Sequence, residues 1–487
     1  MSSSERDRYE LVIGGERTAP AEATYTTSYD PATETAIAEV ATAAAADVDA
    51  AVAAAGEAFS AWGRSGPRER ADQLHAFADR MEAATEELAR LETRDQGKPI
   101  GQSRADITSS VRYLRYYAGA VDKLEGTTVP VGGDQLSYVL REPYGVAAEV
   151  TPWNFPANVL LRGVAPALAA GNTTVVKPAI ATALSSCRIA ELALEAGLPA
   201  GVLNVVPGGP ETGAALVGHP GVDTITFTGS VATGQKVMEA AAAHITDVTL
   251  ELGGKNAALV YPDADIAQTA RWLVRAAFTN AGQVCSAVGR VLVDASVHDA
   301  LVAAVTDAAA GLTVGAGIDD PDVGPLVTGL HRERVEAAIA TARAAGASVV
   351  TGGSPHDGPG HFVEPTVLAE VTPEMAIARE EVFGPVLPIL RVAPEDDPVA
   401  LANDSPYGLV AGVFTHDVTR AHRVAAALEV GTVYINTWWG DTNQTPFGGV
   451  KHSGIGRAKG LAALESYLQT KHVAVGLDAG ADALPGS

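Results

Sequence analysis

The chain has little cysteine and little positive charge. Its 487 residues include two cysteines, Cys187 and Cys285, too few for a disulfide framework in a chain of this size. Lysine and arginine together number 34 against 58 aspartates and glutamates, and the formal net charge is −24. A surface dominated by carboxylates disfavours nucleic acid and anionic membranes as partners.

Long apolar runs and a basic leader are also missing. No uninterrupted apolar stretch approaches the roughly 20 residues that span a bilayer, and residues 1–7 lack the basic-then-apolar pattern of a signal peptide. These absences favour a cytoplasmic protein without a membrane partner. The acidic surface reflects either composition alone or adaptation to concentrated salt, where carboxylate repulsion is screened; we favour a halophilic protein.

The first third of the chain carries helical periodicity and then a hairpin. Residues 9–13 resemble a strand that ends at a double-glycine turn. Apolar residues recur at three- and four-residue spacing over 46–62, 68–92 and 106–119, which predicts amphipathic helices. Residues 126–144 form short alternating runs broken by glycines, which predicts a hairpin-like insertion.

Beyond this insertion, short apolar strands alternate with helical stretches, which predicts an α/β fold with a parallel sheet covered on both faces. The expected strands are 146–150, 173–176, 203–206, 224–227 and 248–250. A second alternating region runs from about 258 to 432, with helices expected near 266–277, 297–309 and 332–345. The small, polar tail 478–487 is expected to be disordered.

Candidate chemical groups follow the predicted strands, and open parallel sheets bind ligands at the carboxyl ends of their strands. Asn154, between two aromatic residues, suits stabilisation of an oxyanion or forms an Asx turn. Lys177 suits a ribose or phosphate, or snorkels to the surface. Gly229 and Ser230 open a helix that either binds a phosphate or is simply capped. Glu251 is a candidate general base or a solvated carboxylate.

The two cysteines have different expected roles. Cys285 lies among glycine and polar residues without a partner cysteine, and it is either an activated nucleophile or a small buried residue. Cys187 lies in a helical stretch, 185–195, and is expected to pack in the core. The histidines show no metal-ligand spacing beside a cysteine or carboxylate cluster, so no metal is expected.

Several motifs in order resemble the aldehyde dehydrogenase superfamily, from about residue 10 to about residue 475. The spacing of 34 between Glu251 and Cys285 also fits that family. The motifs are 151–156, 227–230 with Gly234, 251–255, 282–285, 380–385, and 446–451 with Ser453 and Gly454.

The resemblance implies three parts and an oligomer. A Rossmann-like coenzyme-binding domain would comprise 1–123 and 144–252. An α/β catalytic domain would comprise 253–467. A small β oligomerisation flap and tail would comprise 124–143 and 468–487, and the expected assembly is a homodimer or homotetramer.

The resemblance also implies the roles of the catalytic groups. Cys285 would attack the aldehyde carbon, and the Asn154 amide with the Cys285 backbone N–H would hold the oxyanion. Hydride transfer would leave a thioester, and Glu251 would activate water to release the acid. An acylating branch of the family passes the thioester to coenzyme A, but it usually lacks this glutamate. A catalytically silent scaffold is disfavoured because all three residues are present.

The coenzyme site follows from the same resemblance. Lys177 and Glu381 would hold the two riboses, and Phe383 would pack against the nicotinamide. NAD-using members often have a glutamate where this chain has Ile180, so we expect NAD(P)+ with a leaning towards NADP+ or dual use. The remaining coenzyme-binding residues would be Thr151, Pro152, Trp153, Gly229, Ser230, Gly234 and Leu252.

The substrate pocket would include Arg162, Ser286, Trp438 and Trp439. Arg162 lies eight residues after Asn154, on the same face of the expected helix. Its position is similar to that of the arginine which binds the distal carboxylate in succinic semialdehyde dehydrogenases. The second arginine of some such enzymes is absent here, since that position is Thr279. The tryptophans instead suit an aromatic or cationic (amino- or betaine-type) aldehyde, and Arg162 could be structural; we favour an acidic semialdehyde.

Overall fold

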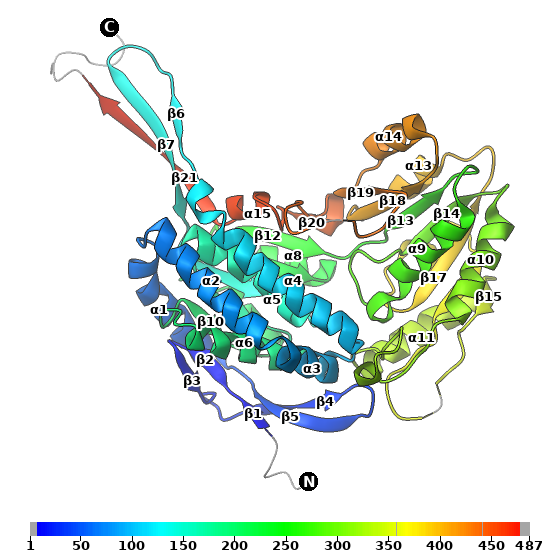
Figure 1. The fold of residues 1–487 in the computed structure, drawn as a ribbon, viewed down its shortest axis with the longest axis horizontal. Helices are drawn as coiled ribbons and strands as arrows, with labels where there is room; N and C mark the ends of the chain where they lie inside the picture. Colours follow the sequence, from blue (N-terminus) through cyan, green and yellow to red (C-terminus); the bar gives the residue numbers. More distant parts are fainter. Residues whose placement is uncertain (1–6, 357, 441, 478–487) are drawn as a thin grey trace.

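The computed structural model describes residues 7–356, 358–440 and 442–477, so the expected disorder of 478–487 lies outside the described residues. Two α/β bodies lie side by side, and a β ribbon projects from one of them (Figure 1). No helix in the described residues is long and apolar enough to cross a bilayer. The predicted α/β fold is confirmed.

The first body is built on an eight-stranded sheet whose five central strands are parallel, as predicted. All five residues of its middle strand, β8, are buried, and four of the five are apolar, as expected for a strand covered on both faces. Antiparallel strands extend the sheet at both edges. In spatial order the strands are β20 (Gly454–Ile455), β12 (Asp247–Leu252), β11 (Thr224–Gly229), β8 (Val146–Val150), β9 (Thr173–Lys177), β10 (Leu203–Val205), β2 (Leu11–Ile13) and β3 (Glu16–Thr18).

Two groups of helices cover this sheet, one on each face. One face packs against α1 (Ala45–Trp62), α7 (Pro210–Val217) and α8 (Val231–Ala242). The other packs against α5 (Pro156–Ala170) and α6 (Leu184–Glu195), which are covered in turn by α2 (Pro67–Ala83), α3 (Thr85–Gln96) and α4 (Ile100–Ala118). Cys187 is 1% exposed in this second core, as predicted.

The prediction of one helix over 68–92 is wrong, because the structure has two helices there. Ala84 separates them with φ −95° and ψ 11°. The chain changes direction at this residue so that Leu88 and Ala89 of α3 are buried, and both α2 and α3 pack against α4. Neither glycine nor proline marks the break. Helix α4 also begins earlier than predicted, directly after Pro99.

The second body contains a seven-stranded sheet in which only β15 is antiparallel. Its order is β15 (Ser348–Thr351), β16 (Thr366–Ala369), β17 (Val386–Val392), β14 (Arg290–Asp294), β13 (Ala257–Val260), β18 (Val410–Phe414) and β19 (Thr432–Ile435). The predicted helices are present within a few residues, as α9 (Ile266–Phe278), α10 (His298–Ala310) and α11 (Gly329–Ala344). Shorter helices are α12 (Ala376–Arg379), α13 (Pro398–Asn403), α14 (Val418–Ala427) and α15 (Ala462–Glu465).

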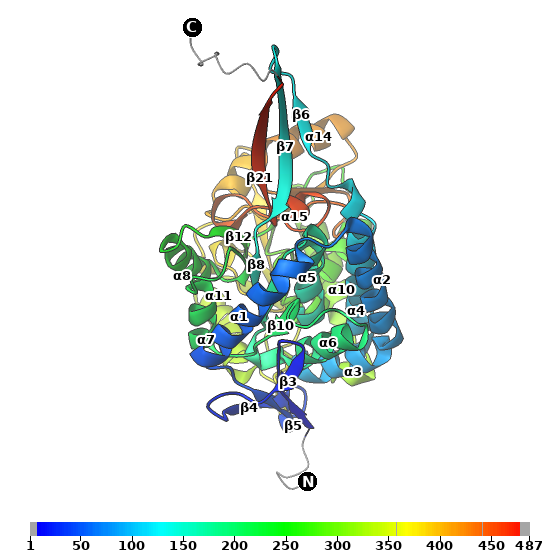
Figure 2. The ribbon, with the colours of Figure 1, turned by 90° about the vertical axis from the view of Figure 1, so that its left-hand side faces the viewer.

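Two small sheets complete the described chain and project at opposite ends in Figure 2. The predicted hairpin is confirmed, and the C-terminal strand joins it as an antiparallel ribbon of β21 (Leu468–Gly476), β7 (Gln135–Pro143) and β6 (Thr127–Val129). The N-terminal sheet contains β1 (Asp7–Tyr9), β5 (Thr35–Ala41) and β4 (Tyr25–Asp30). Single 3-10 turns are η1 (Val121–Lys123), η2 (Ile180–Thr182), η3 (Thr279–Gly282), η4 (Gly317–Asp319) and η5 (Lys451–Ser453).

Candidate active site

A cavity of about 880 Å³ is lined by loops that follow three parallel strands of the first sheet. The loops after β8 and β11 contribute Asn154 and Ser230, the carboxyl end of β12 contributes Glu251, and the second body contributes Cys285 and Glu381. The carboxyl ends of parallel strands meet at one edge of a sheet, which is why residues far apart in the chain converge here.

The loop that carries Cys285 is held in a rare backbone conformation. Asn280, Ala281 and Gly282 have successive φ values of 50°, 53° and 73°, a left-handed path that costs non-glycine residues about 1–3 kcal/mol each. A Cβ at Gly282 would collide with the carbonyl oxygen of Gly384. The Asn256 amide then fixes the end of the loop by donating to the Cys285 carbonyl oxygen (2.8 Å).

The Cys285 thiol is predominantly protonated at neutral pH. Burial raises its pKa to about 11, and Arg162 opposes this shift while the carboxylates of Glu251 and Glu381 add to it. The thiolate is the nucleophile, so attack on a substrate needs removal of the thiol proton. Cationic charge near the sulfur would favour that removal.

Asn154 joins the two bodies and keeps one donor free. Its side-chain N–H donates to the Gln283 carbonyl oxygen (2.8 Å), and its backbone carbonyl oxygen accepts from the Asn280 amide (3.0 Å). A primary amide has two donor hydrogens, so the second can serve a group bound beside Cys285. Asn154 is 5% exposed and lines the cavity.

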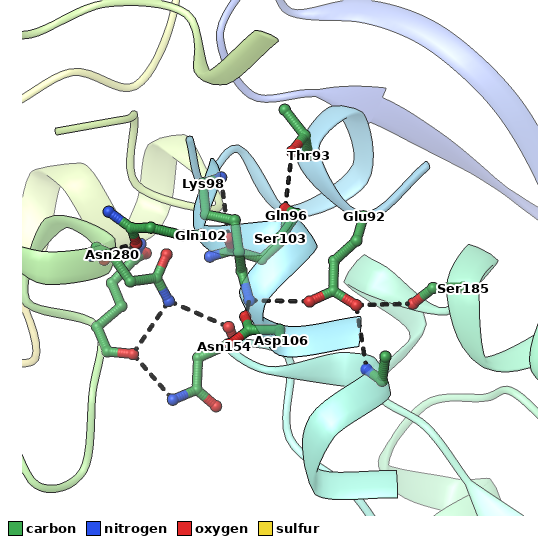
Figure 3. A network of polar contacts seen from close by, with 12 residues as sticks. Glu92, Thr93, Gln96, Lys98, Gln102, Ser103, Asp106, Asn154, Ser185 and Asn280 are labelled. Carbon is green, nitrogen blue, oxygen red and sulfur yellow. Dashed lines mark hydrogen bonds and ion pairs between the residues drawn. The ribbon is translucent and has the colours of Figure 1, made fainter. Parts of the chain in front are cut away.

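A buried ionic network lies behind the Asn154 loop (Figure 3). The Lys98 amine, 0% exposed, donates to Glu92 Oε1 (2.9 Å) and Asp106 Oδ2 (2.7 Å) and lies 4.2 Å from the centre of the Phe155 ring. Glu92 Oε2 accepts from the backbone N–H of Ala157 in the first turn of α5 (3.1 Å). Burial lowers the pKa of Lys98, but the two carboxylates more than reverse this and leave the pKa raised.

We call Glu92, Lys98 and Asp106 the Lys98 cluster. It anchors the C-terminal side of the Asn154 loop, since it contacts Phe155 directly and holds the start of α5. From the same helix as Asp106, Gln102 Oε1 accepts the backbone N–H of Asn280 (3.0 Å). Sequence reasoning missed this cluster, because a Lys-Pro step after a glycine carries no sign of where its charge is paired.

Glu251 is buried and unpaired. It is 3% exposed, which excludes the solvated alternative. Neither of its carboxylate oxygens has a hydrogen-bond partner among the described residues. Burial raises its pKa to about 7, against the lowering effect of Arg162, the nearby Ala458 backbone N–H, Arg457 and Lys459. A base with a pKa near the working pH suits general base catalysis.

The expected coenzyme residues offer a set of groups that fits a dinucleotide. Lys177, the last residue of β9, forms no ion pair among the described residues, and burial lowers its pKa to about 8. Ser230 caps α8 with its hydroxyl, which accepts from the Thr233 N–H (3.3 Å), and the first N–H groups of α8 are available for an anion. Glu381 Oε1 accepts from the Gly254 N–H (3.0 Å). An unpaired amine, a helix N-terminus and a carboxylate match ribose and phosphate groups.

The other coenzyme candidates lie nearby. Pro152, Trp153, Gly229, Leu252 and Phe383 line the large cavity, and the Trp153 and Phe383 rings meet edge to face at 5.4 Å. Gly234 packs under Leu252, where a Cβ would come within 2.8 Å of its side chain. Thr151 is buried, and its hydroxyl lines a smaller neighbouring cavity instead.

The expected substrate residues separate into two groups. Arg162, Ser286 and Trp439 line the cavity, and the Trp439 indole N–H donates to Ser286 Oγ (2.9 Å). Trp438 does not line it: this residue is 1% exposed and its indole N–H donates to the Ser286 carbonyl oxygen (2.8 Å). The side chain of Trp438 packs in the core of the second body, so its position contradicts a place in the pocket wall.

Basic side chains dominate the polar part of this cavity. Arg162 forms no ion pair among the described residues and lies 5.6 Å from the Phe447 ring. Of the three acids in the wall, Asp106 is bound to Lys98. Sequence reasoning missed most of the cations, which come from four separate segments. The four that it missed are Arg112, Arg275, Arg334 and Lys459.

Comparisons with known proteins agree on one family. The model of the aldehyde dehydrogenase family matches residues 18–473. Hydroxyisobutyraldehyde dehydrogenase of Mycolicibacterium austroafricanum is 42% identical over 453 residues, covering 92% of this chain and 90% of that protein. The NAD+ complex of an aldehyde dehydrogenase from Bacillus cereus is 41% identical, with a TM-score of 0.95 and 97% of each chain covered. Betaine aldehyde dehydrogenase of Staphylococcus aureus with NAD+ is 37% identical, with a TM-score of 0.95 and 97% and 96% covered.

Proposed function

The chain belongs to the aldehyde dehydrogenase family, and from this premise we propose that it oxidises an aldehyde to a carboxylic acid through a thioester on Cys285. The observation that carries the proposal is the convergence of Cys285, Asn154 and Glu251 on one cavity. A silent scaffold would have no need of an unpaired buried carboxylate beside a cysteine, because such a group is costly to bury.

Each step uses a group of this chain. The Cys285 thiol releases its proton to cavity water as the sulfur bonds to the aldehyde carbon, and the free N–H of Asn154 donates to the oxygen that becomes negative. A nicotinamide coenzyme held by the residues named below would supply the hydride acceptor. Glu251 then takes a proton from water as the water oxygen bonds to the thioester carbon, and the sulfur leaves as thiolate. Because Glu251 serves water, we propose hydrolysis rather than transfer to coenzyme A.

We propose that Lys177 and Glu381 hold the two riboses and that the N-terminus of α8 holds the pyrophosphate. NAD+ is bound in the Bacillus cereus and Staphylococcus aureus relatives, which supports a nicotinamide coenzyme. Ile180, in the turn η2, has no carboxylate to repel a 2′-phosphate. NADP+ use, alone or beside NAD+, is therefore part of the proposal.

An acidic aldehyde is the proposed substrate class. The basic side chains of the cavity wall support it, as does Arg162, which forms no ion pair among the described residues, because this positive charge would attract a substrate carboxylate. The same side chains disfavour a cationic aldehyde such as that named for the Staphylococcus aureus relative. Trp439 and Phe447 keep an aromatic aldehyde as the second candidate.

We also propose that the chain is divided into three functional parts. Coenzyme binding is assigned to 1–123 and 144–252, catalysis to 253–467, and oligomerisation to 124–143 with 468–487. Exposed apolar side chains on the ribbon, among them Val129, Leu136 and Val475, support its use in a homodimer or homotetramer. We also propose a cytoplasmic location.

A substrate panel tests the function and the substrate class together. Succinic semialdehyde, butanal, benzaldehyde, betaine aldehyde and hydroxyisobutyraldehyde are compared by kcat/KM with both coenzymes. Arg162→Ala should lower the ratio for succinic semialdehyde over butanal by about 10-fold to 150-fold, the worth of a hydrogen bond to a charged group. Using a ratio cancels any effect of Arg162 on Cys285 or Glu251.

The control is Arg391→Ala, at an exposed site of β17, which should leave the ratio unchanged. An unchanged ratio in Arg162→Ala would mean that Arg162 is structural and that the substrate is not acidic. Cys285→Ala should show no turnover with any aldehyde of the panel, and activity in that variant would refute the proposed chemistry.

A further inference from the structure

A second, water-sized cavity of about 20 Å³ adjoins the large one. Glu251 and Arg162 line both cavities. The remaining wall includes Glu149, Thr226 and Tyr467. A space of this size can hold one water where polar partners surround it, and Glu251 brings two carboxylate oxygens that have no partner in the described chain.

Glu149 is an unusual residue in the middle of a buried parallel strand. It belongs to β8, is 1% exposed and forms no ion pair within the described residues. Its Oε1 accepts from the Tyr467 hydroxyl (2.6 Å), which lies 3.0 Å from the Thr226 hydroxyl. Burial raises the pKa of Glu149 to about 8, while Tyr467 and Arg162 act to lower it.

Helix α5 leaves room for the Glu149 carboxyl group. A Cβ at Gly163 of α5 would collide with Glu149 Oε2. Gly163 directly follows Arg162, so one turn of α5 both admits Glu149 and supplies the cation that faces the two glutamates. A glycine inside a helix costs about 1 kcal/mol relative to alanine, a cost that the room for Glu149 explains.

We propose that Glu149 is the proton-exchange partner of Glu251: water in the small cavity carries to Glu149 the proton that Glu251 takes during thioester hydrolysis. This inference rests on the proposed function. Glu149 touches neither substrate nor sulfur, so it acts through Glu251.

The step balances without any further reactant. The water oxygen bonds to the thioester carbon, the carbon–sulfur bond breaks, and its electron pair leaves on Cys285. The water proton passes to Glu251 and then, through cavity water, to the ionised fraction of Glu149, which grows as the pH approaches 8, and Glu149 releases it to solvent. Glu251 is thereby returned to its basic form before the next hydrolysis.

Cations on several elements set the balance between the two carboxyl groups. Arg162 of α5 faces both glutamates, whereas Arg457, after β20, and Lys459 face Glu251. Tyr467, before β21, is the neutral donor to Glu149. The pKa values of about 7 and about 8 are close, so the proton can move between the two carboxyls without a large barrier from unequal affinity.

Glu149→Gln tests the proposal, because glutamine keeps the shape and can still accept from Tyr467. In stopped-flow experiments with excess aldehyde, the burst of reduced coenzyme should keep its rate and amplitude. The steady-state rate should fall by about tenfold or more, part of the 10²- to 10⁴-fold that positioned proton transfer supplies. One ionisation should also disappear from the pH profile of that rate.

Asp95→Asn is the matched control. Asp95 is another buried acid of the same body, with a pKa raised to about 7 by burial, but it lines neither cavity and is held by Ser28 and Leu184 instead. It should change neither the burst nor the pH profile.

Tyr467→Phe is a second, independent variant. It keeps the Glu149 carboxyl but removes the hydrogen bond that lowers its pKa, so the pH profile of the steady-state rate should shift to higher pH with the burst intact. The proposal is overturned if Glu149→Gln has the wild-type steady-state rate and pH profile, or if it loses burst and steady state equally. The wild-type enzyme distinguishes a failure of this inference from a failure of the proposed function. If the wild-type enzyme gives no burst of reduced coenzyme with any aldehyde, the proposed function is refuted instead.

Discussion

Two groups of buried charged residues in the first body differ in whether their charges are paired. In the Lys98 cluster, one amine holds two carboxylates at 2.9 and 2.7 Å. Around the two glutamates of the small cavity, Glu251 accepts no hydrogen bond from the described residues and space for water remains. Paired charge holds loops in place, whereas unpaired charge beside a cavity leaves room for a reacting molecule.

The cost of burial makes this difference informative. An uncompensated buried ion costs several kcal/mol, so a fold keeps one only where something offsets that cost, and perturbed carboxyls in clefts are candidates for function. The Lys98 cluster fixes the position of Asn154, and the glutamates supply proton chemistry beside it. Variants of the two groups test whether the Lys98 cluster is structural and the glutamates take part in proton transfer.

The largest expected effect is on stability. Lys98→Met should lower the free energy of unfolding by about 3–5 kcal/mol, because it leaves two carboxylates buried without a cation. Urea unfolding measures this loss. Lys123→Met, which removes an ion pair with Asp122 at a lysine that is 61% exposed, should change it by less than about 1 kcal/mol. Equal losses in the two variants would remove the distinction between the clusters.

Removing Glu149 should have a smaller effect that depends on pH. Its pKa is raised in the folded protein from 4.5 to about 8, so the folded state keeps a proton that the unfolded chain releases. The stabilisation is complete below about pH 4.5 and is lost as the pH rises towards 8, by up to about 1.4 kcal/mol per pH unit.

The free energy of unfolding of the wild type, relative to Glu149→Gln, should therefore fall between pH 5 and 8. Denaturant titrations at several pH values measure it. Parallel pH curves for the two proteins would show that Glu149 does not hold a proton in the folded state.

Lys98 and Lys177 extend the comparison to the coenzyme. Lys98 is paired and structural, whereas Lys177 has no acidic partner in the described chain and is free for a ligand. With Ile180 beside it, kcat/KM for NADP+ should be within about tenfold of that for NAD+ or higher, a difference of at most about 1.4 kcal/mol.

Ile180→Glu should shift this preference towards NAD+ by repelling a 2′-phosphate. A wild-type preference for NAD+ above about a hundredfold, roughly 2.7 kcal/mol, would mean that another residue excludes the phosphate.

Salt should have the smallest effect and should separate surface charge from buried charge. The net charge of −24 predicts that Tm rises between about 0.1 and about 2 M potassium chloride as repulsion is screened. The loss in Lys98→Met should stay the same over that range, since buried pairs are screened little. A flat or falling Tm would leave the acidic composition without a role in salt adaptation.

The sequence was most informative where chemistry is local. Strand β8 has the predicted bounds because a strand buried on both faces is mostly apolar, and only Glu149 interrupts this run; the loops that follow the parallel strands do line one cavity. The break at Ala84 was missed because no glycine or proline marks it. The two adjacent tryptophans were assigned together, although only tertiary packing decides that Trp438 points into the core and Trp439 into the cavity.

The arrangement around Glu149 and Glu251 could not be predicted from the sequence, for a different reason. Tyr467 lies 318 positions from Glu149, and nothing in either local pattern indicates that they meet. A lone glutamate in an apolar strand is a visible anomaly, but its meaning depends on Gly163, Arg162 and Glu251, which other elements bring to it.

The most direct test of the account is a stopped-flow measurement on Glu251→Gln with saturating aldehyde and coenzyme. Hydride transfer precedes the step that uses Glu251, so one equivalent of reduced coenzyme per active site should form at nearly the wild-type rate. The following steady-state rate should be lower by about 10²- to 10⁴-fold, while Cys285→Ala should give no burst. A Glu251→Gln enzyme with a normal steady-state rate would contradict the central claim that the unpaired carboxylate is the base of hydrolysis.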